Sequence, residues 1–275
     1  MRLRIIIALF ILSALINSCI DRNNMEFSDI PIIEGYLRPG DYVRLKVGRQ
    51  IPFSSNVTYS SDDINALKIT ITNNNTDYLL TPLGNGKYID SSLIVSTGER
   101  YDLSFKFNSK TVSAYTTIPF KPVKFAESDT SISVMRMDST STPTAGGGMW
   151  IMPTPITLTW TNSDESYYIV VVENMEDSLD PVRQLSSTDT IPFKRFNKPP
   201  TTASGLEMRA QEFTYFGRDR LILYHVLPDY ASLYETSSNS SQNLTNPSTS
   251  ITNGYGIFTG LNADTLFLTV LEATK

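Results

Sequence analysis

The sequence has very little of the side-chain chemistry that most catalytic and metal sites need. Its 275 residues include one cysteine, Cys19, and one histidine, His225. A single cysteine cannot form a disulfide framework, and the two residues together cannot supply a zinc site of the Cys/His type. His225 lies in the alternating stretch Leu221 to Val226, which predicts a packed or half-exposed strand residue rather than a catalytic base. We therefore expect a protein that is not an enzyme and has no catalytic residues.

The sequence also lacks a concentration of positive charge. Its formal net charge is −5, and no long basic run is present. A nucleic-acid-binding surface needs clustered lysine and arginine to meet the phosphate backbone, so we expect no nucleic-acid partner. The triple glycine at residues 146–148 has neither the lysine nor the strand-to-helix setting of a phosphate-binding loop.

The one long apolar run is too short to cross a membrane. Ile5 to Ile16, interrupted only by Ser13, falls short of the ~20 residues of a spanning helix. It follows a basic start and ends at Asn17-Ser18-Cys19, the layout of a signal peptide. Residues 16–19 resemble the lipobox of bacterial lipoproteins, with an aliphatic residue at −3 and serine at −1 of the cysteine. We expect a signal peptide over residues 1–18 and lipidation at Cys19; the alternative is an ordinary secretory signal with an unrelated cysteine.

Lipidation at Cys19 would make the protein membrane-anchored. A diacylglyceryl thioether and an N-acyl chain together provide more than one lipid chain, which is the condition for stable anchoring. Residues 19–29 are mostly polar and without period, so we expect a flexible tether. Asp21 and Glu26 give it a resemblance to the acidic signals that direct Bacteroidetes lipoproteins to the cell surface. We expect an outer-membrane protein facing the exterior, with the periplasmic face left open as the alternative.

The remaining chain is rich in β-forming residues. Hydrophobic residues make up 40%, with 14 Tyr and 13 Phe, and short segments such as 66–72 and 99–108 alternate apolar and polar side chains, which predicts strands. Roughly seven such strands at about ten-residue spacing predict an immunoglobulin-like sandwich over residues 30–120.

A second sandwich is predicted over residues 121–275, with a long loop at 138–149. Residues 155–160 and 166–173 are expected to form a hairpin that resembles two strands of a fibronectin type III domain, with Trp160 in the core. Residues 229–235 predict a brief helix and 264–273 a closing strand. The predicted fold is therefore all-β, with two tandem β-sandwich domains and a short helical insertion in the second.

Acidic clusters are the only candidates for a metal site. Asp62-Asp63 and the group Glu173, Glu176, Asp177 and Asp180 could supply oxygen ligands, but neither has the spacing of a calcium loop. Such clusters in polar turns are usually solvated, so we expect no metal and no cofactor apart from the lipid on Cys19.

One short stretch is a candidate contact surface. Met149, Trp150 and Met152 follow the triple glycine, and Trp and Met are favoured interface anchors. The alternative is that this stretch begins a strand with Trp150 buried.

Several motifs together resemble the Bacteroidetes lipoprotein family catalogued as domain of unknown function 4249. Beside the lipobox they are IIEGYL at 32–37, the Gly-x-Tyr step at 86–88, GERYDLSF at 98–105, Pro228-Asp229-Tyr230 with Tyr234, and NPSTSITNGYGIFTG at 246–260. In the last motif Tyr255 stands between two glycines where a small residue is commoner.

The resemblance implies a role beside TonB-dependent outer-membrane transporters. We expect an accessory or ligand-capture subunit of such a channel, with Tyr255 as a further candidate contact residue. The alternative for the region around it is a loop, set by glycines at positive φ, whose Ile257 and Phe258 fill the core. The alternative function is a structural subunit of a fimbria or adhesin, which an exposed donor strand or a removable first strand would distinguish.

Overall fold

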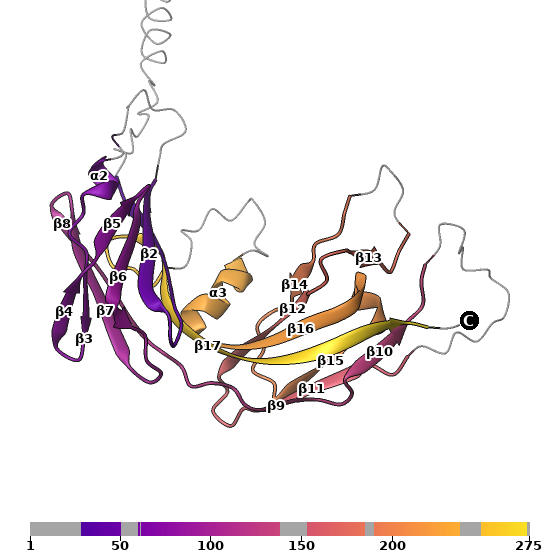
Figure 1. Ribbon diagram of the computed structural model, residues 1–275. Coiled ribbons are helices and arrows are strands. Elements are labelled where there is room, and N and C mark those ends of the chain that lie inside the picture. Colours follow the sequence, from indigo (N-terminus) through magenta and orange to yellow (C-terminus); the bar gives the residue numbers. More distant parts are fainter. Residues whose placement is uncertain are drawn as a thin grey trace, which may run out of the picture. The chain divides into compact units, whose positions relative to one another are not determined.

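The computed structural model describes residues 29–50, 60, 62–137, 153–184, 190–236 and 249–273. From Ile30 onward these residues belong to one compact unit, which spans Ile30–Gln50 and Val57–Lys275. The predicted signal peptide, Cys19, the loop at 138–149 and the candidate contacts Met149, Trp150 and Met152 lie outside the described residues. The fold is all-β with a small helical content, as predicted (Figure 1).

The N-terminal sandwich consists of two sheets that share one core. The first sheet has the order β17-β1-β2-β6-β5 and continues into the C-terminal part, and the second has the order β4-β3-β7-β8. The strands are β1 (Pro31–Leu37), β2 (Tyr42–Arg49), β3 (Thr70–Asn73), β4 (Thr76–Leu79), β5 (Thr81–Gly84), β6 (Lys87–Ile94), β7 (Arg100–Phe107), β8 (Lys110–Thr117) and β17 (Tyr255–Glu272).

The C-terminal part is also built from two facing sheets. One has the order β14-β12-β16-β17, with β10 pairing with the end of β17 and β13 with β16, and the other has the order β15-β11-β9. Its elements are β9 (Val123–Glu127), β10 (Ser131–Val134), β11 (Ile156–Thr161), β12 (Tyr167–Asn174), β13 (Asp180–Pro181), β14 (Arg195–Asn197), β15 (Gly205–Met208), the 3-10 helix η1 (Ala210–Glu212), β16 (Tyr215–Val226) and the helix α3 (Pro228–Thr236). The short helix α2 (Asp62–Asn65) belongs to the N-terminal sandwich. Among the described helices, none is long and apolar enough to cross a membrane.

Local sequence rules account for the turns. Asn74 and Asn75 both have positive φ, 48° and 61°, between the paired residues Asn73 and Thr76. Two left-handed residues in a two-residue loop match the twist of a hairpin, and Asn tolerates that conformation. These two asparagines therefore form the turn of the β3–β4 hairpin.

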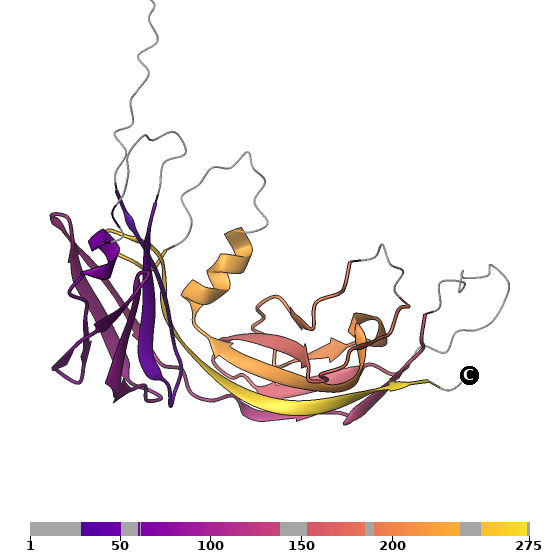
Figure 2. The same cartoon turned by 45° about the horizontal axis from the view of Figure 1, so that its top comes forward.

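Strand β17 is longer than predicted and takes part in both the N-terminal sandwich and the C-terminal part. Residues 255–260 pair in parallel with β1, residues 261–270 pair antiparallel with β16, and residues 269–272 pair in parallel with β10 (Figures 1 and 2). The predicted closing strand therefore begins at Tyr255, and the loop predicted for Gly254–Phe258 is wrong from that residue on. Ile257 and Phe258 are buried, as predicted, at 4% and 0% exposure.

The core of the N-terminal sandwich includes residues from the end of the chain. Ile251 and Phe258 pack there with apolar residues between Ile33 and Ile118. No residue after 120 was assigned to this core from the sequence. A second core lies between the C-terminal sheets and contains Trp160, which was predicted to be a core tryptophan and is 4% exposed.

The predicted hairpin of β11 with β12 is wrong. β11 pairs with β9 and β15, whereas β12 pairs with β14 and β16. The burial patterns explain the separation: β11 alternates buried and exposed residues, but β12 is almost continuously buried. A strand with two covered faces belongs in the middle of a layered structure, and a strand with one exposed face belongs in an outer layer.

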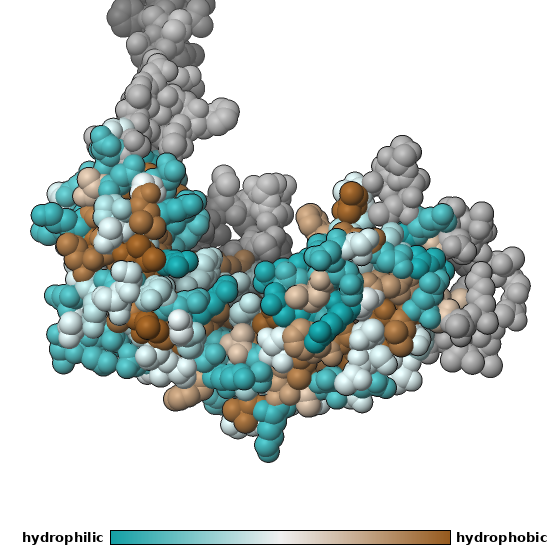
Figure 3. Space-filling model, in the orientation of Figure 1, coloured by the Kyte–Doolittle hydropathy of each residue, from teal (hydrophilic) through white to brown (hydrophobic). Residues whose placement is uncertain are grey.

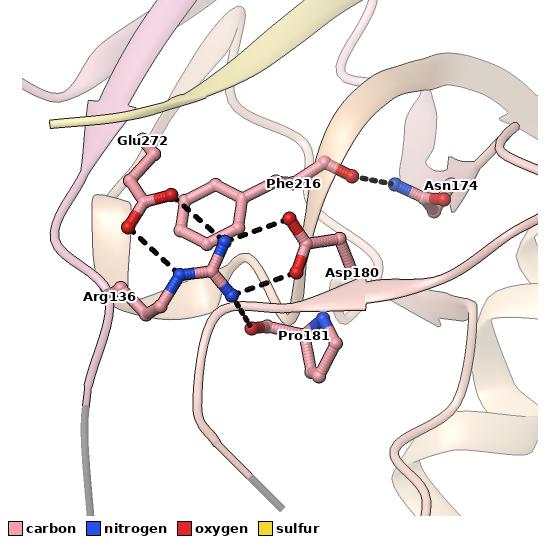
Figure 4. Close-up of polar contacts among 6 residues, drawn as sticks. All are labelled: Arg136, Asn174, Asp180, Pro181, Phe216 and Glu272. Carbon is pink, nitrogen blue, oxygen red and sulfur yellow. Dashed lines mark hydrogen bonds and ion pairs between the residues drawn. The ribbon is translucent and has the colours of Figure 1, made fainter.

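Arg136 joins the far ends of three segments of the C-terminal part (Figure 4). Its guanidinium donates to Glu272 at 2.8 and 2.9 Å, to Asp180 at 2.8 Å twice, and to the Pro181 carbonyl at 3.1 Å. It also lies over the Phe216 ring, 4.6 Å from the centroid. These partners raise the pKa of Arg136, with the hydrogen bond to Asp180 as the largest cause. The hydrogen-bonding capacity of the Arg136 guanidinium is therefore taken up by contacts within the fold.

Candidate functional site

A pocket lies on the face of the long sheet that is opposite the second core. Its floor is formed by four aliphatic side chains, Ile169 and Val171 of β12, Val226 of β16 and Leu261 of β17. All four are at most 5% exposed and form a small apolar cluster of their own with Ile222. The cavity has a volume of about 270 Å³, at the lower end of the range of small-molecule sites. We call it the α3 pocket, because the helix α3 forms one of its walls.

The floor exists because β12 is apolar on both faces. Tyr168, Val170 and Val172 enter the second core, and the alternate residues Ile169 and Val171 face the pocket. Successive strand residues point to opposite faces, so an unbroken apolar run such as YYIVVV supplies both. The run was assigned to a strand from the sequence, but the second apolar face was not recognised as the floor of a site.

Helix α3 carries two of the tyrosines that line the pocket. It starts at Pro228, a favoured first helical residue, and Tyr230 and Tyr234 are four residues apart and so share one face. The Asp229 carboxylate accepts a hydrogen bond from the Thr259 hydroxyl at 2.9 Å, which ties the helix start to β17. Thr259 is fully buried, so this contact fixes the helix beside the floor.

Tyrosine rings form the wall of the pocket. Tyr36 from β1 meets Tyr230 edge to face, with centroids 6.0 Å apart, and Tyr230 meets Tyr234 at 6.1 Å. Tyr224 of β16 is the fourth tyrosine lining the cavity. Burial raises the pKa of Tyr230 to about 12, and burial likewise raises that of Tyr36. A phenol of ordinary pKa is already neutral near pH 7, and burial moves these two further in that direction, so both can donate hydrogen bonds.

Two arginines provide the charge of the pocket. Arg38 directly follows the end of β1, and its guanidinium carbon lies 5.9 Å from the Tyr224 ring centroid. Arg195 comes from the edge strand β14 and lines the pocket with Asn197, whose amide donates to the Tyr234 hydroxyl at 3.2 Å. Among the described residues that line the pocket there is no carboxylate.

Neither pocket arginine has an ion-pair partner in the part of the chain that the structure describes. Glu173 stands opposite Arg195 in the β12–β14 ladder, but its carboxylate accepts from Arg220 at 2.6 Å. That hydrogen bond is the largest cause of the lowered pKa of Glu173, and Arg195 adds a smaller charge effect. The pocket thus presents two guanidinium groups that form no ion pair within the described fold.

Two further hollows adjoin the pocket. One of about 400 Å³ shares Arg38, Tyr224 and Leu261 with it, and one of about 560 Å³ on the outer face of the N-terminal sandwich shares Tyr36. Both are wider and shallower, and the second includes the exposed Leu83. Hydrophobic residues gather on the part of this sandwich that faces the viewer in Figure 3. The α3 pocket is the most enclosed of the three.

The candidate residues from the sequence lie elsewhere. Tyr255 is the first residue of β17, half-buried and paired with Ile32, and it does not line the α3 pocket. His225 is a half-exposed strand residue, as predicted: its Nδ1 lies 2.8 Å from the Phe120 carbonyl and its ring stacks on Tyr168. The sequence did mark Tyr230 and Tyr234, but as family motif residues and not as a site.

The acidic clusters are separated by the fold. Asp63 pairs with Arg49, Glu173 with Arg220 and Asp180 with Arg136. Glu176 accepts from the Arg218 backbone at 2.9 Å. Within the described ranges, no group of three or more metal-capable side chains occurs.

Comparison with known proteins gives one finding. Residues 22–266 match the family model described as domain of unknown function, DUF4249. A search of curated proteins found no match.

Proposed function

The chain belongs to the DUF4249 family, and from that premise we propose that it is a non-enzymatic lipoprotein of the outer membrane that captures a ligand for a TonB-dependent transporter or a related complex. In this proposal Cys19 carries the lipid anchor, residues 19–29 form the tether, and the folded part faces the cell exterior. The family match covers the chain from residue 22, directly after the proposed anchor.

The observation that carries the ligand-capture role is the α3 pocket. It combines an aliphatic floor, an aromatic wall and two cations without a carboxylate partner in the described fold. A pocket of apolar surface with a few converging polar groups is the usual form of a small-molecule site. Within the described lining, the ionisable groups of this pocket are arginines and tyrosines, which do not make an acid–base pair for work near pH 7, and burial raises the pKa of Tyr230 further, to about 12. Binding without chemistry is therefore the role that it supports best.

The fimbrial alternative receives less support. The first described strand, β1, is paired on both sides, with β2 and with β17. It is not an exposed strand that could pair with a neighbouring subunit without rearrangement.

The test is co-purification from native membranes. The tagged lipoprotein, solubilised from outer membranes, should bring a TonB-dependent channel with it in stoichiometric amount. Cys19→Ala should remove the lipid, release the protein from the membrane fraction and abolish recovery of the channel. Recovery of a ladder of like subunits, with no channel, would contradict the proposal and favour fimbrial assembly.

The candidate contacts can be tested in the same experiment. Trp150→Ala, Met149→Ala with Met152→Ala, and Tyr255→Ala should each reduce recovery of the channel if these side chains anchor the partner. Phe193→Ala is a matched control, because Phe193 is 86% exposed and lies outside both candidate regions. Equal loss with the control would remove these residues from the proposed interface.

A further inference from the structure

We propose that the ligand of the α3 pocket is a small organic anion, a carboxylate or phosphate carried on a planar ring. This inference rests on the proposed ligand-capture role and adds the chemical class of what is captured. It follows from the charge, the shape and the composition of the pocket, taken in turn.

The charge of the pocket favours an anionic ligand. Arg38 and Arg195 line the same cavity, and among the described residues no carboxylate lines it and neither arginine has an ion pair. By contrast, Arg136 uses two carboxylates of the fold and Arg220 uses Glu173. A guanidinium presents a planar fork of donors that matches carboxylate and phosphate oxygens.

The aromatic walls and the aliphatic floor favour a ligand that contains a ring. The aliphatic floor removes apolar surface from water, and the rings of Tyr36 and Tyr230 stand edge to face beside it. Aromatic side chains prefer offset-stacked or edge-to-face contact with another ring. A volume of about 270 Å³ suits a single ring with its substituents and excludes a polymer chain as the enclosed group.

The polar groups at the rim set the orientation. The Asn197 amide and the neutral phenol of Tyr230 are hydrogen-bonding groups at the cavity surface. Arg38 directly follows β1 and Arg195 belongs to β14, and these strands are separated in the sheet by β12, β16 and β17, so the two arginines reach the cavity from different sides. In this proposal the anionic group of the ligand meets a guanidinium group while the ring lies toward the aliphatic floor.

The test is calorimetric titration of the full chain, purified in detergent at low ionic strength, with matched small probes. Benzoate and phenyl phosphate test the two anionic groups, benzamide is the neutral isostere of benzoate, and acetate and inorganic phosphate are the anions without a ring. We expect at least one ring-bearing anion to bind about tenfold or more tightly than benzamide, because a hydrogen bond to a charged group is worth about 1.5–3 kcal/mol. The preferred ring anion identifies the source as carboxylate or phosphate.

Variants of the two pocket arginines test whether the probe binds in the α3 pocket. Arg38→Gln and Arg195→Gln should each weaken binding of the preferred probe about tenfold. Arg209→Gln is the matched control, since Arg209 is exposed, has no ion pair in the described fold and does not line the pocket. Circular dichroism checks that each variant is folded, and the comparison of benzoate with benzamide on the unmodified chain needs no variant.

Three results would overturn the inference: no binding of either ring anion, equal affinity for benzamide, or an equal loss with Arg209→Gln. The transporter experiment separates this failure from failure of the proposed function. If the channel co-purifies but no ring anion binds, only the ligand class is wrong. If ring anions bind as expected but no channel is recovered, the ligand class stands and the transporter role fails.

Discussion

The ring of Tyr36 meets the ring of Tyr230 edge to face, with centroids 6.0 Å apart and planes at 78°. Tyr36 is on the outward face of β1, and Tyr230 is on helix α3. The contact therefore joins the N-terminal sandwich to the helix that walls the α3 pocket, and both rings line that pocket.

The two tyrosines should stabilise the fold as a pair. In a double-mutant cycle, Tyr36→Ala and Tyr230→Ala should show a coupling free energy of about 0.5–1.5 kcal/mol, the value of an aromatic pair beyond area burial. Urea unfolding of the four proteins measures it. Tyr115, which is 62% exposed on β8, supplies the control: Tyr115→Ala and Tyr230→Ala should be additive. A zero coupling for the first pair would show that the contact contributes nothing.

The Arg136 cluster should depend on the shape of the guanidinium and not on charge alone. Arg136→Lys keeps the positive charge but cannot make the paired bonds to both Asp180 and Glu272. We expect the free energy of unfolding to fall by about 1 kcal/mol, a modest value because both acids are about half exposed. Arg100→Lys, whose pair with Asp102 is solvent-exposed, should change little. Equal stability of Arg136→Lys and the unmodified protein would refute the prediction.

Buried Asp219 should make the protein less stable as the pH rises. Asp219 is 3% exposed, and burial raises its pKa to about 6, with an added charge effect from Glu176 against a hydrogen bond from Asn174. In the unfolded chain the value is about 3.9. Between these two values the folded state holds more protons, so the free energy of unfolding falls as pH rises through the window, by up to about 3 kcal/mol.

Asp219→Asn isolates this effect. The variant should match the unmodified protein near pH 4 and be more stable at pH 8, because it has no charge to bury. Carboxylates with a lowered pKa, such as those of Asp180 and Glu173, stabilise the folded protein, and this contribution to the free energy of unfolding is lost as the pH falls. The loss is the same in both proteins. Urea unfolding across the range measures the difference, and a constant gap between the two curves would argue against a raised pKa.

Gly256 should be required where β17 meets β1. Its φ is +97°, and a Cβ there would lie 2.0 Å from the Ile33 carbonyl oxygen. Gly256→Ala should therefore lower the free energy of unfolding by about 2 kcal/mol or more. Gly40→Ala is the control: Gly40 has φ +85° but nothing within 4 Å of its Cβ position, so its smaller loss measures the cost of the positive φ alone. Similar losses for both variants would mean that the close approach has no cost.

Local patterns in the sequence determined the class of the fold and many of its strands. The alternation of Tyr101, Leu103, Phe105 and Phe107 is that of β7, with all four side chains buried, because successive strand residues face opposite sides. The Asn74-Asn75 turn, the core position of Trp160 and the helix near Tyr230 followed from equally local rules.

Which strands pair, and where the pocket forms, was decided only by the tertiary structure. The run YYIVVV specifies two apolar faces but not what covers each one, and the short segment between β11 and β12 suits a hairpin as well as a crossing between sheets. Tyr36, Arg195 and Tyr230 are brought together by β1, β14 and α3, which are far apart in the chain. Periodicity reports the environment of one segment at a time, whereas a binding pocket is a property of side chains from several segments. The sequence by itself therefore determined many of the strands, long-range packing determined the site, and the lipid anchor at Cys19 remains a proposal drawn from the sequence.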